Sequence, residues 1–567
     1  MGGISVEYFS RNSRHCGIAL HTTKTCIAHC GWIPNRNSLQ FAIFRLRRKI
    51  IADFGNKPYT KPLPHIMTKM RTITIIFTIL IFGFISCSIE KKKEITINGQ
   101  IVGHGNPDKI EFTIPIDGKW FYGDKKSITT DSTGKFQIKI DTDNPSFTTI
   151  YVPGKSGGIL LTEPGQTYNV NIELDKERKS FYIDSPNSNG QRFYNTLPAP
   201  EFHMMGLSEF YNDSIPEEIS SKINSLRESE ISKFHELLKK KEISKDFHQL
   251  AVLDREVYYS ALEAGAASIL LQKYLNEKES LVIDSLKKFW NTKLKVSNII
   301  GNDSDRSPWF YTLASNFIRY AQLSSEEFDP EILKKKYETG DIYQYNIDEA
   351  KKYLAGEELE YYLASYIYYE SWQTKDNSKK IIGAYENFRK EHPQSPYNEY
   401  LEASIKPIVT FHKNLKNAKA NEKIEFVENY EEIDTFKDLI SKLNGKKVFV
   451  DIWGTWCAPC KKEFEHKKSL EQLLNSKEIA SLYICEGKNS KEKVWHEMIK
   501  SYDLEGYHLL TNEKLLTDII NEFGNNGRFA YPRYLLVDEN GKVVNGEASY
   551  PSQIIQLEKE INENYVW

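Results

Sequence analysis

From residue 94 onward, the spacing of apolar residues divides the chain into three parts, and the first part has the period of β-strands. Apolar and polar residues alternate around Phe136, Ile138 and Ile140, and turn sequences such as Pro164-Gly165 separate the alternating segments. A period of two is typical of strands that bury one face. Residues 94–185 are therefore predicted to form a small all-β domain with a sandwich-like or barrel-like core.

Between residues 190 and 415 the apolar period becomes helical. Ile219 and Ile223 stand four residues apart, and Ser214 precedes a proline and two glutamates, which is typical of a helix start. Tyrosines crowd the segment 361–369, for which packing between helices is the prediction and a partner-binding surface is the alternative. Further helices are predicted at 348–354, 357–372, 378–390 and 397–413. This part is predicted to be an all-α domain.

The last part, residues 424–567, alternates between short β-favouring runs and amphipathic helical runs. Asp434 is the predicted N-cap of the first helix, and Asn540-Gly541 is the predicted turn of a hairpin. Strands are predicted at 424–427, 447–452, 479–485, 507–510, 534–537 and 542–544, and helices at 434–443, 491–501, 513–523 and 552–562. Such alternation predicts an α/β sandwich. The predicted fold class is thus multidomain, with an all-β, an all-α and an α/β domain in that order.

The beginning of the chain has a different character. Residues 1–66 show no periodicity, whereas the apolar run 73–85 follows two basic residues and precedes Ser86-Cys87. A membrane-spanning helix needs about 20 apolar residues, so this shorter run fits a signal-peptide core better, with a short uncleaved anchor as the alternative. Because a signal core belongs near the start of translation, residues 1–66 are predicted to be a non-native extension, with Met67 or Met70 as the true start.

Residues 84–87, Phe-Ile-Ser-Cys, resemble the cleavage box of bacterial lipoproteins. The resemblance implies that 67–87 is a lipoprotein signal peptide with its cleavage box, that Cys87 carries the lipid, and that the mature protein is anchored to a membrane on the periplasmic side of the bacterial envelope. From Cys87 onward, acidic residues outnumber basic ones by 75 to 63. This acidic balance argues against a nucleic-acid partner.

A Cys-x-x-Cys pair stands where the predicted strand 447–452 meets a predicted helix. Cys457 is at the start of that helix, where unpaired N–H groups and the helix dipole favour a thiolate. Cys460, one turn later, is placed to attack a mixed disulfide formed at Cys457. The pair therefore predicts thiol-disulfide exchange, with Cys457 as the nucleophile.

A structural zinc site is the alternative for this pair, but it would need further ligands at fixed spacing. Cys485 is the only cysteine that follows Cys460 in the sequence. No metal site is therefore predicted. Cys485 ends an apolar predicted strand, so a buried thiol is predicted rather than a third redox partner.

The residues around the pair resemble the active-site signature of the thioredoxin superfamily. They are Asp451, Trp453, Trp456, Cys457, Pro459 and Cys460. The run Trp456 to Cys460 followed by Glu463 is similar to TlpA/ResA-like thiol-disulfide oxidoreductases, although Phe464 stands where that group often has proline. The β-rich domain likewise resembles one often found ahead of thioredoxin modules in exported lipoproteins.

The thioredoxin resemblance implies roles for further residues. It implies a cis peptide bond between Tyr531 and Pro532 that faces the cysteines, beside a strand edge free for a substrate peptide. It places Asp451 as a buried carboxylate with a raised pKa that shuttles the proton of Cys460, with a surface position as the alternative. Glu463 either tunes the second thiol or is simply solvated.

Together these features predict a lipid-anchored, envelope-exposed thiol-disulfide oxidoreductase whose only redox group is the Cys457–Cys460 disulfide, with no cofactor. Its predicted partners are proteins with thiols or disulfides and a membrane electron donor. Ala458 and Pro459 place no histidine between the cysteines, so a reductant is favoured over a strong oxidant. The alternative is a partner-binding lipoprotein whose thioredoxin-like domain serves mainly as a scaffold.

Overall fold

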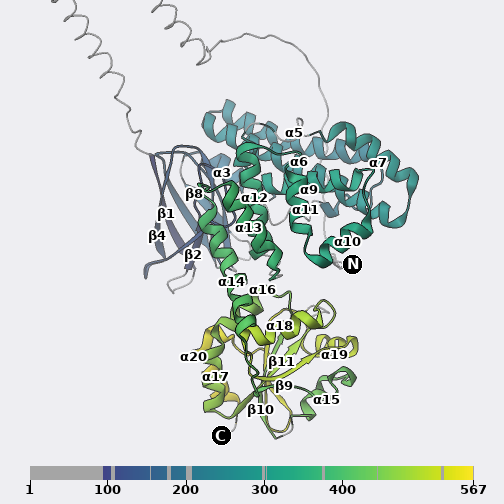
Figure 1. Ribbon diagram of the computed structural model, residues 1–567. Coiled ribbons are helices and arrows are strands. Elements are labelled where there is room, and N and C mark those ends of the chain that lie inside the picture. The colour runs from purple at the N-terminus through teal and green to yellow at the C-terminus, as the bar shows by residue number, and fades with distance from the viewer. Residues whose placement is uncertain are drawn as a thin grey trace, which may run out of the picture. The chain divides into compact units, whose positions relative to one another are not determined.

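The computed structural model describes residues 93–565, except 104–108, 154, 175–179, 185, 199–206, 296–300, 302, 373–376, 444 and 525–528. In that part of the chain, β-strands come first, helices follow and a mixed α/β domain comes last (Figure 1). The predicted order of all-β, all-α and α/β folds is confirmed. The predicted extension 1–66, the signal segment 67–87 and Cys87 lie outside the described residues.

The β domain consists of two four-stranded sheets with strand orders β4-β1-β7-β8 and β3-β2-β5-β6. The strands are β1 Lys93–Val102, β2 Lys109–Thr113, β3 Lys125–Thr129, β4 Lys135–Thr142, β5 Ser146–Val152, β6 Ser156–Thr162, β7 Thr167–Glu173 and β8 Ser180–Asp184. Phe136, Ile138 and Ile140 are buried on β4 while their neighbours face solvent. Side chains from both sheets share one core, so the fold is a sandwich.

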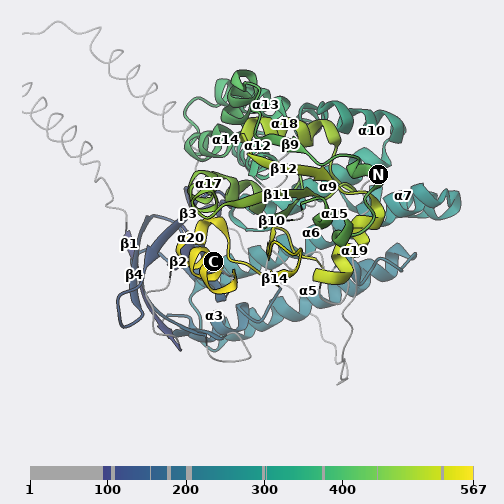
Figure 2. The same cartoon turned by 90° about the horizontal axis from the view of Figure 1, so that it is seen from below.

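The central part is helical. Its elements are α3 Ser188–Tyr194, α5 Pro216–Lys239, α6 Lys245–Glu277, α7 Ser280–Lys293, η2 Ser304–Arg306, α9 Phe310–Ser324, α10 Pro330–Thr339, α11 Ile342–Ala350, α12 Gly356–Trp372, α13 Lys379–Glu391 and α14 Asn398–Asn417. Helices α5 and α6 lie side by side (Figure 2) and are joined by the ion pair Arg227–Glu256. The N-cap of α5 is Ile215, not Ser214, and it makes no side-chain capping bond. None of the described helices has the length and apolar character needed to cross a membrane.

Most of the tyrosine-rich segment of α12 packs inside the protein, as predicted, although Tyr369 is 41% exposed. Tyr361 and Tyr362 are almost fully buried. Phe121, from the loop between β2 and β3, is also fully buried, with its ring centre 6.4 Å from that of Tyr361 and 4.9 Å from that of Tyr397. The hydroxyl of Tyr361 donates a hydrogen bond to the carbonyl of Trp120 at 2.5 Å. The tyrosines therefore hold a loop of the β domain against the helices.

The C-terminal domain contains a six-stranded sheet with the order β14-β13-β10-β11-β12-β9. The strands are β9 Ile424–Phe426, β10 Lys447–Trp453, β11 Ile479–Cys485, β12 Gly506–Leu510, β13 Arg533–Val537 and β14 Val543–Asn545. Central β10 is parallel to β11 and antiparallel to β13. Gly541 has a positive φ of 81°, as the hairpin turn between β13 and β14 requires.

Helices cover both faces of this sheet. They are α15 Phe436–Ser441, α16 Ala458–Glu463, α17 Lys467–Ser476, α18 Glu492–Tyr502, α19 Glu513–Phe523 and α20 Ile554–Asn564. Helices α15 and α19 pack against one face, and α17 and α20 pack against the other (Figure 1). The N-cap of α15 is Thr435, which accepts a bond from the N–H of Asp438 at 3.1 Å, so the prediction of Asp434 was wrong. Asp434 instead pairs with Lys514.

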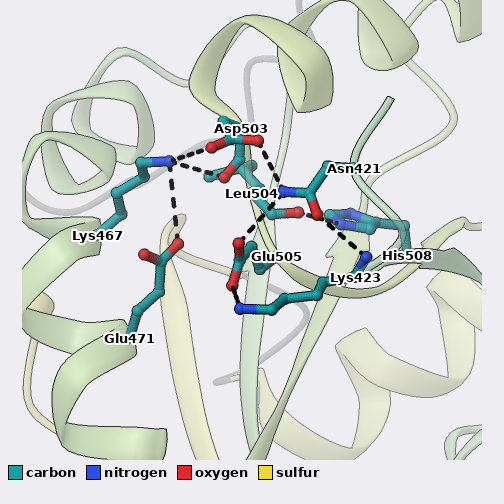
Figure 3. Close-up of polar contacts among 8 residues, drawn as sticks. All are labelled: Asn421, Lys423, Lys467, Glu471, Asp503, Leu504, Glu505 and His508. Atoms are coloured by element: carbon teal, nitrogen blue, oxygen red, sulfur yellow. Dashed lines mark hydrogen bonds and ion pairs between the residues drawn. The ribbon is translucent and has the colours of Figure 1, made fainter. Parts of the chain in front are cut away.

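A polar network fixes the segment that leads from α14 into the C-terminal sheet (Figure 3). The side-chain amide of Asn421 donates to Asp503 at 2.9 Å, and Lys423 pairs with Glu505 at 2.9 Å. Lys467, at the start of α17, donates to the carbonyl of Asp503 at 2.7 Å. These contacts tie the segment to the turn between α18 and β12.

Candidate active site

The two cysteines occupy the junction between strand β10 and helix α16. Cys457 is the N-cap of α16, and its sulfur accepts a hydrogen bond from the N–H of Cys460 at 3.1 Å. The cysteines form a disulfide with a Cα–Cα distance of 5.3 Å. The predicted helix is interrupted, because a 3₁₀ turn at Phe464–His466 separates α16 from α17. The junction matches the predicted strand, turn and helix start.

The disulfide lies just below the protein surface. Cys457 is 2% exposed and Cys460 is completely buried, whereas the neighbouring Trp456 is 41% exposed. Pro459, between the cysteines, is exposed as well. Of the two cysteines, Cys457 is therefore the less buried, and an incoming thiol can approach it with the smaller rearrangement.

The loop that precedes β13 lies beside this junction. The peptide bond between Tyr531 and Pro532 is cis, as the thioredoxin resemblance implied. The Tyr531 ring packs edge-on against the Trp456 ring with centres 5.2 Å apart, and Phe529 packs against Tyr531 at 4.9 Å. The structure thus brings Trp456 and the cis-proline loop together into one aromatic surface.

Asp451 is buried in the middle of β10. Its exposed fraction is 2%, so the alternative of a surface aspartate is wrong. Burial, and then the nearby Glu463 carboxylate, raise the pKa of Asp451 well above its ordinary value. A carboxyl group with a raised pKa holds its proton to higher pH, which suits a group that exchanges protons with a thiol.

Glu463, at the end of α16, is partly exposed and hydrogen-bonded. Its carboxylate accepts bonds from the backbone N–H and the hydroxyl of Ser552 at 2.9 and 3.0 Å. Ser552 belongs to the 3₁₀ turn Pro551–Gln553 that precedes α20. Glu463 is therefore anchored to the turn that precedes the C-terminal helix, and its charge also acts on Asp451.

Sequence reasoning missed Glu486, which directly follows β11. Its side chain is 3% exposed and accepts a bond from the indole N–H of Trp456 at 2.8 Å and from the backbone N–H of Asn489 at 3.1 Å. Strand β11 pairs with β10 so that Cys485 is beside Trp453. The sequence could have indicated Glu486 by its position, because it is a glutamate directly after the strand that pairs with β10, the strand that leads to Cys457.

Cys485 is a buried free thiol, as predicted. Burial raises its pKa far above the usual range, against a hydrogen bond with Ser490 that lowers it. Such a thiol is a poor nucleophile. Within the described residues, no three His, Cys, Asp or Glu side chains are grouped as a metal site would require.

Residues 434–561 match the family model described as Redoxin. These residues form a Redoxin-type, ResA-like thioredoxin domain. The thiol-disulfide oxidoreductase ResA of Bacillus subtilis is 32% identical over 105 residues, which are 18% of this chain and 54% of that protein. ResA of Bacillus cereus is 30% identical over 105 residues, 18% of this chain and 56% of its own length.

This chain therefore spans about half the length of the curated relatives it matches. Among solved structures, the thioredoxin domain of a thiol-disulfide oxidoreductase from Bacteroides vulgatus aligns with 22% of this chain and 81% of its own. That alignment has 20% identity and a TM-score of 0.19.

Proposed function

We propose that this protein is a thiol-disulfide oxidoreductase that reduces disulfides in other proteins through Cys457 and Cys460. The observation that carries the proposal is the disulfide between these residues at the strand-helix junction, with Cys457 as the less buried partner. Similarity of the domain to ResA proteins supports the reaction class.

The reaction begins with the reduced pair. The Cys457 thiolate attacks one sulfur of a client disulfide, whose S–S bond breaks and releases one client thiolate. The Cys460 thiol then gives its proton to the Asp451 carboxylate, and its sulfur attacks Cys457. The bond between Cys457 and the client breaks, and the second client thiolate leaves. The client gains two electrons, and the pair becomes the Cys457–Cys460 disulfide.

One contact of the site favours the thiolate of Cys457, and it is also the cap of α16. The N–H of Cys460 already points at its sulfur, and a thiolate accepts such a bond more strongly than a thiol does. Through this same bond the sulfur caps the first turn of α16, where the helix dipole favours a negative charge. During reduction of a client, Tyr531 and Pro532 bind the client chain next to Cys457. Trp456 and Pro459 form the surface that the client contacts.

The setting of this activity is also part of the proposal. The apolar run 73–85 and Cys87 support a lipid anchor that holds the protein at the envelope membrane, on the periplasmic side. Because each turnover leaves the pair oxidised, a membrane electron donor must reduce it again. Ala458 and Pro459 between the cysteines support the reducing direction over the oxidising one.

The test is reduction of insulin by the purified protein with a chemical reductant as the electron source. We expect turnover by the wild type and none by Cys457→Ser. In cells, Cys460→Ser should accumulate a mixed disulfide between Cys457 and its client, because the resolving thiol is missing. If wild type and Cys457→Ser are equally inert toward every disulfide tried, the proposal is wrong and a binding scaffold replaces it.

A further inference from the structure

The two sheets of the β domain differ in what their outer faces contact. The sheet β3-β2-β5-β6 buries its outer face, where Phe147 and Leu161 share an apolar cluster with Phe247 of α6. On the sheet β4-β1-β7-β8, buried apolar side chains alternate with exposed or half-exposed polar ones, as on β4 and β7. The outer face of this second sheet is therefore a polar surface in contact with solvent.

Amide side chains form two adjacent rows across this polar face. In the first row, Asn98 on β1 is the register partner of Gln137 on β4 and of Asn169 on β7. The side chain of Gln137 donates a hydrogen bond to that of Asn98 at 2.9 Å, and Asn98 donates to Asn169 at 3.5 Å. In the second row, two residues further along the strands, Gln100 is the register partner of Asn171. Asparagine is a residue that strands disfavour, so strand formation does not explain this set of side chains.

The two rows line a hollow of about 540 Å³. Its lining includes one acid and one base, Asp131 and Lys135, whose charges balance. Oδ1 of Asp131 already accepts hydrogen bonds from the backbone N–H of Thr133 at 2.8 Å and of Lys135 at 3.0 Å. The hollow therefore offers mainly amide donors and acceptors, without a net charge.

An exposed aromatic ring stands beside the second row. Tyr182 on β8 is directly opposite Asn171 in an antiparallel pair, and its side chain is 45% exposed. Side chains at opposed positions of such a pair share a face, with Cβ atoms about 4.5–5.5 Å apart. Tyrosine combines a large apolar ring with a polar hydroxyl. The rim of the hollow thus adds an apolar contact surface to the amides.

We propose that this face of the β domain binds a neutral oligosaccharide. The binding residues are Asn98, Gln100, Gln137, Asn169, Asn171 and Tyr182. A side-chain amide has two N–H donors and a carbonyl acceptor, which suits sugar hydroxyl groups because they both donate and accept. Neighbouring strands lie about 4.8 Å apart, close to the length of one hexose unit in a chain. The balanced charge of the lining favours neither an acidic nor a basic ligand.

The test is isothermal titration calorimetry of the purified protein with four neutral probes, maltohexaose, cellohexaose, xylohexaose and chitohexaose. We expect at least one of them to bind, and acidic polygalacturonate not to bind. Asn171→Ala should weaken the binding about fivefold, because one hydrogen bond is lost. Tyr182→Ala should weaken it by about the same factor, because the apolar ring surface is lost.

Lys139→Ala is the matched control. Lys139 is on the same face of β4, two residues beyond Gln137, and lies outside the lining of the hollow. This variant should bind the oligosaccharide as the wild type does. All three variants should keep the wild-type melting temperature, because exposed substitutions change stability little. Insulin reduction should also be unchanged in all three, so the result is separate from that for the cysteine pair.

The inference is overturned if none of the four neutral probes binds at millimolar concentration, or if polygalacturonate binds as well as they do. Equal weakening by Asn171→Ala and Lys139→Ala would overturn it too, because the binding would then not involve the hollow. If sedimentation shows that the wild type dimerises and Asn171→Ala does not, the face is a contact between two copies of this chain, and the assignment to carbohydrate is wrong.

Discussion

The indole N–H of Trp456 donates a hydrogen bond to the buried carboxylate of Glu486 at 2.8 Å. The bond joins the turn that carries Cys457 to the end of β11, and the Tyr531 ring packs edge-on against the same indole. An exposed aromatic surface next to the cysteines is thereby held in one orientation by a buried group.

Glu486→Ala should weaken client recognition more than the chemical step. The variant loses the bonds from Asn489 as well as the bond from Trp456, but only the Trp456 bond reaches the exposed surface, and its loss is worth about 1 kcal/mol, which is about a fivefold change in affinity. We expect KM for insulin to rise by about that factor, with kcat nearly unchanged and the Trp456 indole N–H resonance broadened. Glu492→Ala, an exposed change on α18, is the control. An unchanged KM together with an altered indole resonance would show that the position of Trp456 does not matter to the client.

The features that the sequence could predict are those determined by residues close together in the chain. The alternation on β4, the bounds of β11 and α19, and the strand-helix junction at Cys457 all depend on neighbouring residues. Glu486 was missed because its partner, Trp456, follows a different strand, and the register between two strands cannot be deduced from the sequence of either strand alone. The contact of Phe121 with the tyrosines of α12 could not be predicted either, because these tyrosines lie more than two hundred residues further along the chain.

The first residues of helices show the same limit of sequence-based prediction within a few residues. Ser214 and Asp434 are good capping residues, yet the helices begin one residue later than these caps would require. At the start of α15, Thr435 is the capping residue, and Asp434 forms an ion pair with Lys514 on α19 instead. Where two adjacent residues can both cap, tertiary contacts decide which of them does.

Asp451→Asn should remove a pH dependence from the resolving step. The raised pKa of Asp451 means that the carboxylate, the form proposed to accept the Cys460 proton, is populated only as pH rises through that pKa. The wild-type rate should therefore climb through this range, and the variant should be slower above it and flat across it. Stopped-flow decay of a mixed disulfide at a series of pH values measures the step, with exposed Asp143→Asn as the control.

The same substitution should change stability with a defined sign. Native Asp451 binds its proton to higher pH than the unfolded chain, whose aspartates titrate near about 3.9. The free energy of unfolding of the wild type thus falls as pH rises from that value through the native pKa, and the variant lacks this fall. Urea denaturation should find Asp451→Asn increasingly more stable than wild type as pH rises, with the two converging near about pH 4. If the free energies of unfolding of the two proteins differed by the same amount at all pH values, the raised pKa of buried Asp451 would be contradicted.

Cys485 should be unreactive in the folded protein. It is completely buried, and burial raises the pKa of its thiol, so few molecules present an accessible thiolate. In the reduced protein, a maleimide should modify residue 485 at least about 100-fold more slowly than Cys457. Peptide mass spectrometry distinguishes the two sites, and denaturant should equalise them. Rapid labelling of residue 485 under native conditions would mean that the end of β11 opens readily.

Helix α14 should be needed for the stability of the site. Phe411 on this helix is 4% exposed and shares an apolar cluster with Trp453 and Cys460. Its carbonyl also accepts a bond from the Ser501 hydroxyl at 2.8 Å. Truncation of a buried phenylalanine typically costs about 3–5 kcal/mol. Phe411→Ala should therefore lower the unfolding midpoint of the C-terminal domain markedly.

The same variant should also loosen the surroundings of the cysteines, because the cavity it creates lies in the cluster that buries Cys460. Reduction of the Cys457–Cys460 disulfide by dithiothreitol should then be faster than in the wild type. Val409→Ala is the control, since Val409 is on the same helix but 45% exposed, and surface changes of this kind stay within about 0.5 kcal/mol. Equal unfolding midpoints and equal reduction rates for the two variants would show that α14 only connects the domains and does not support the site.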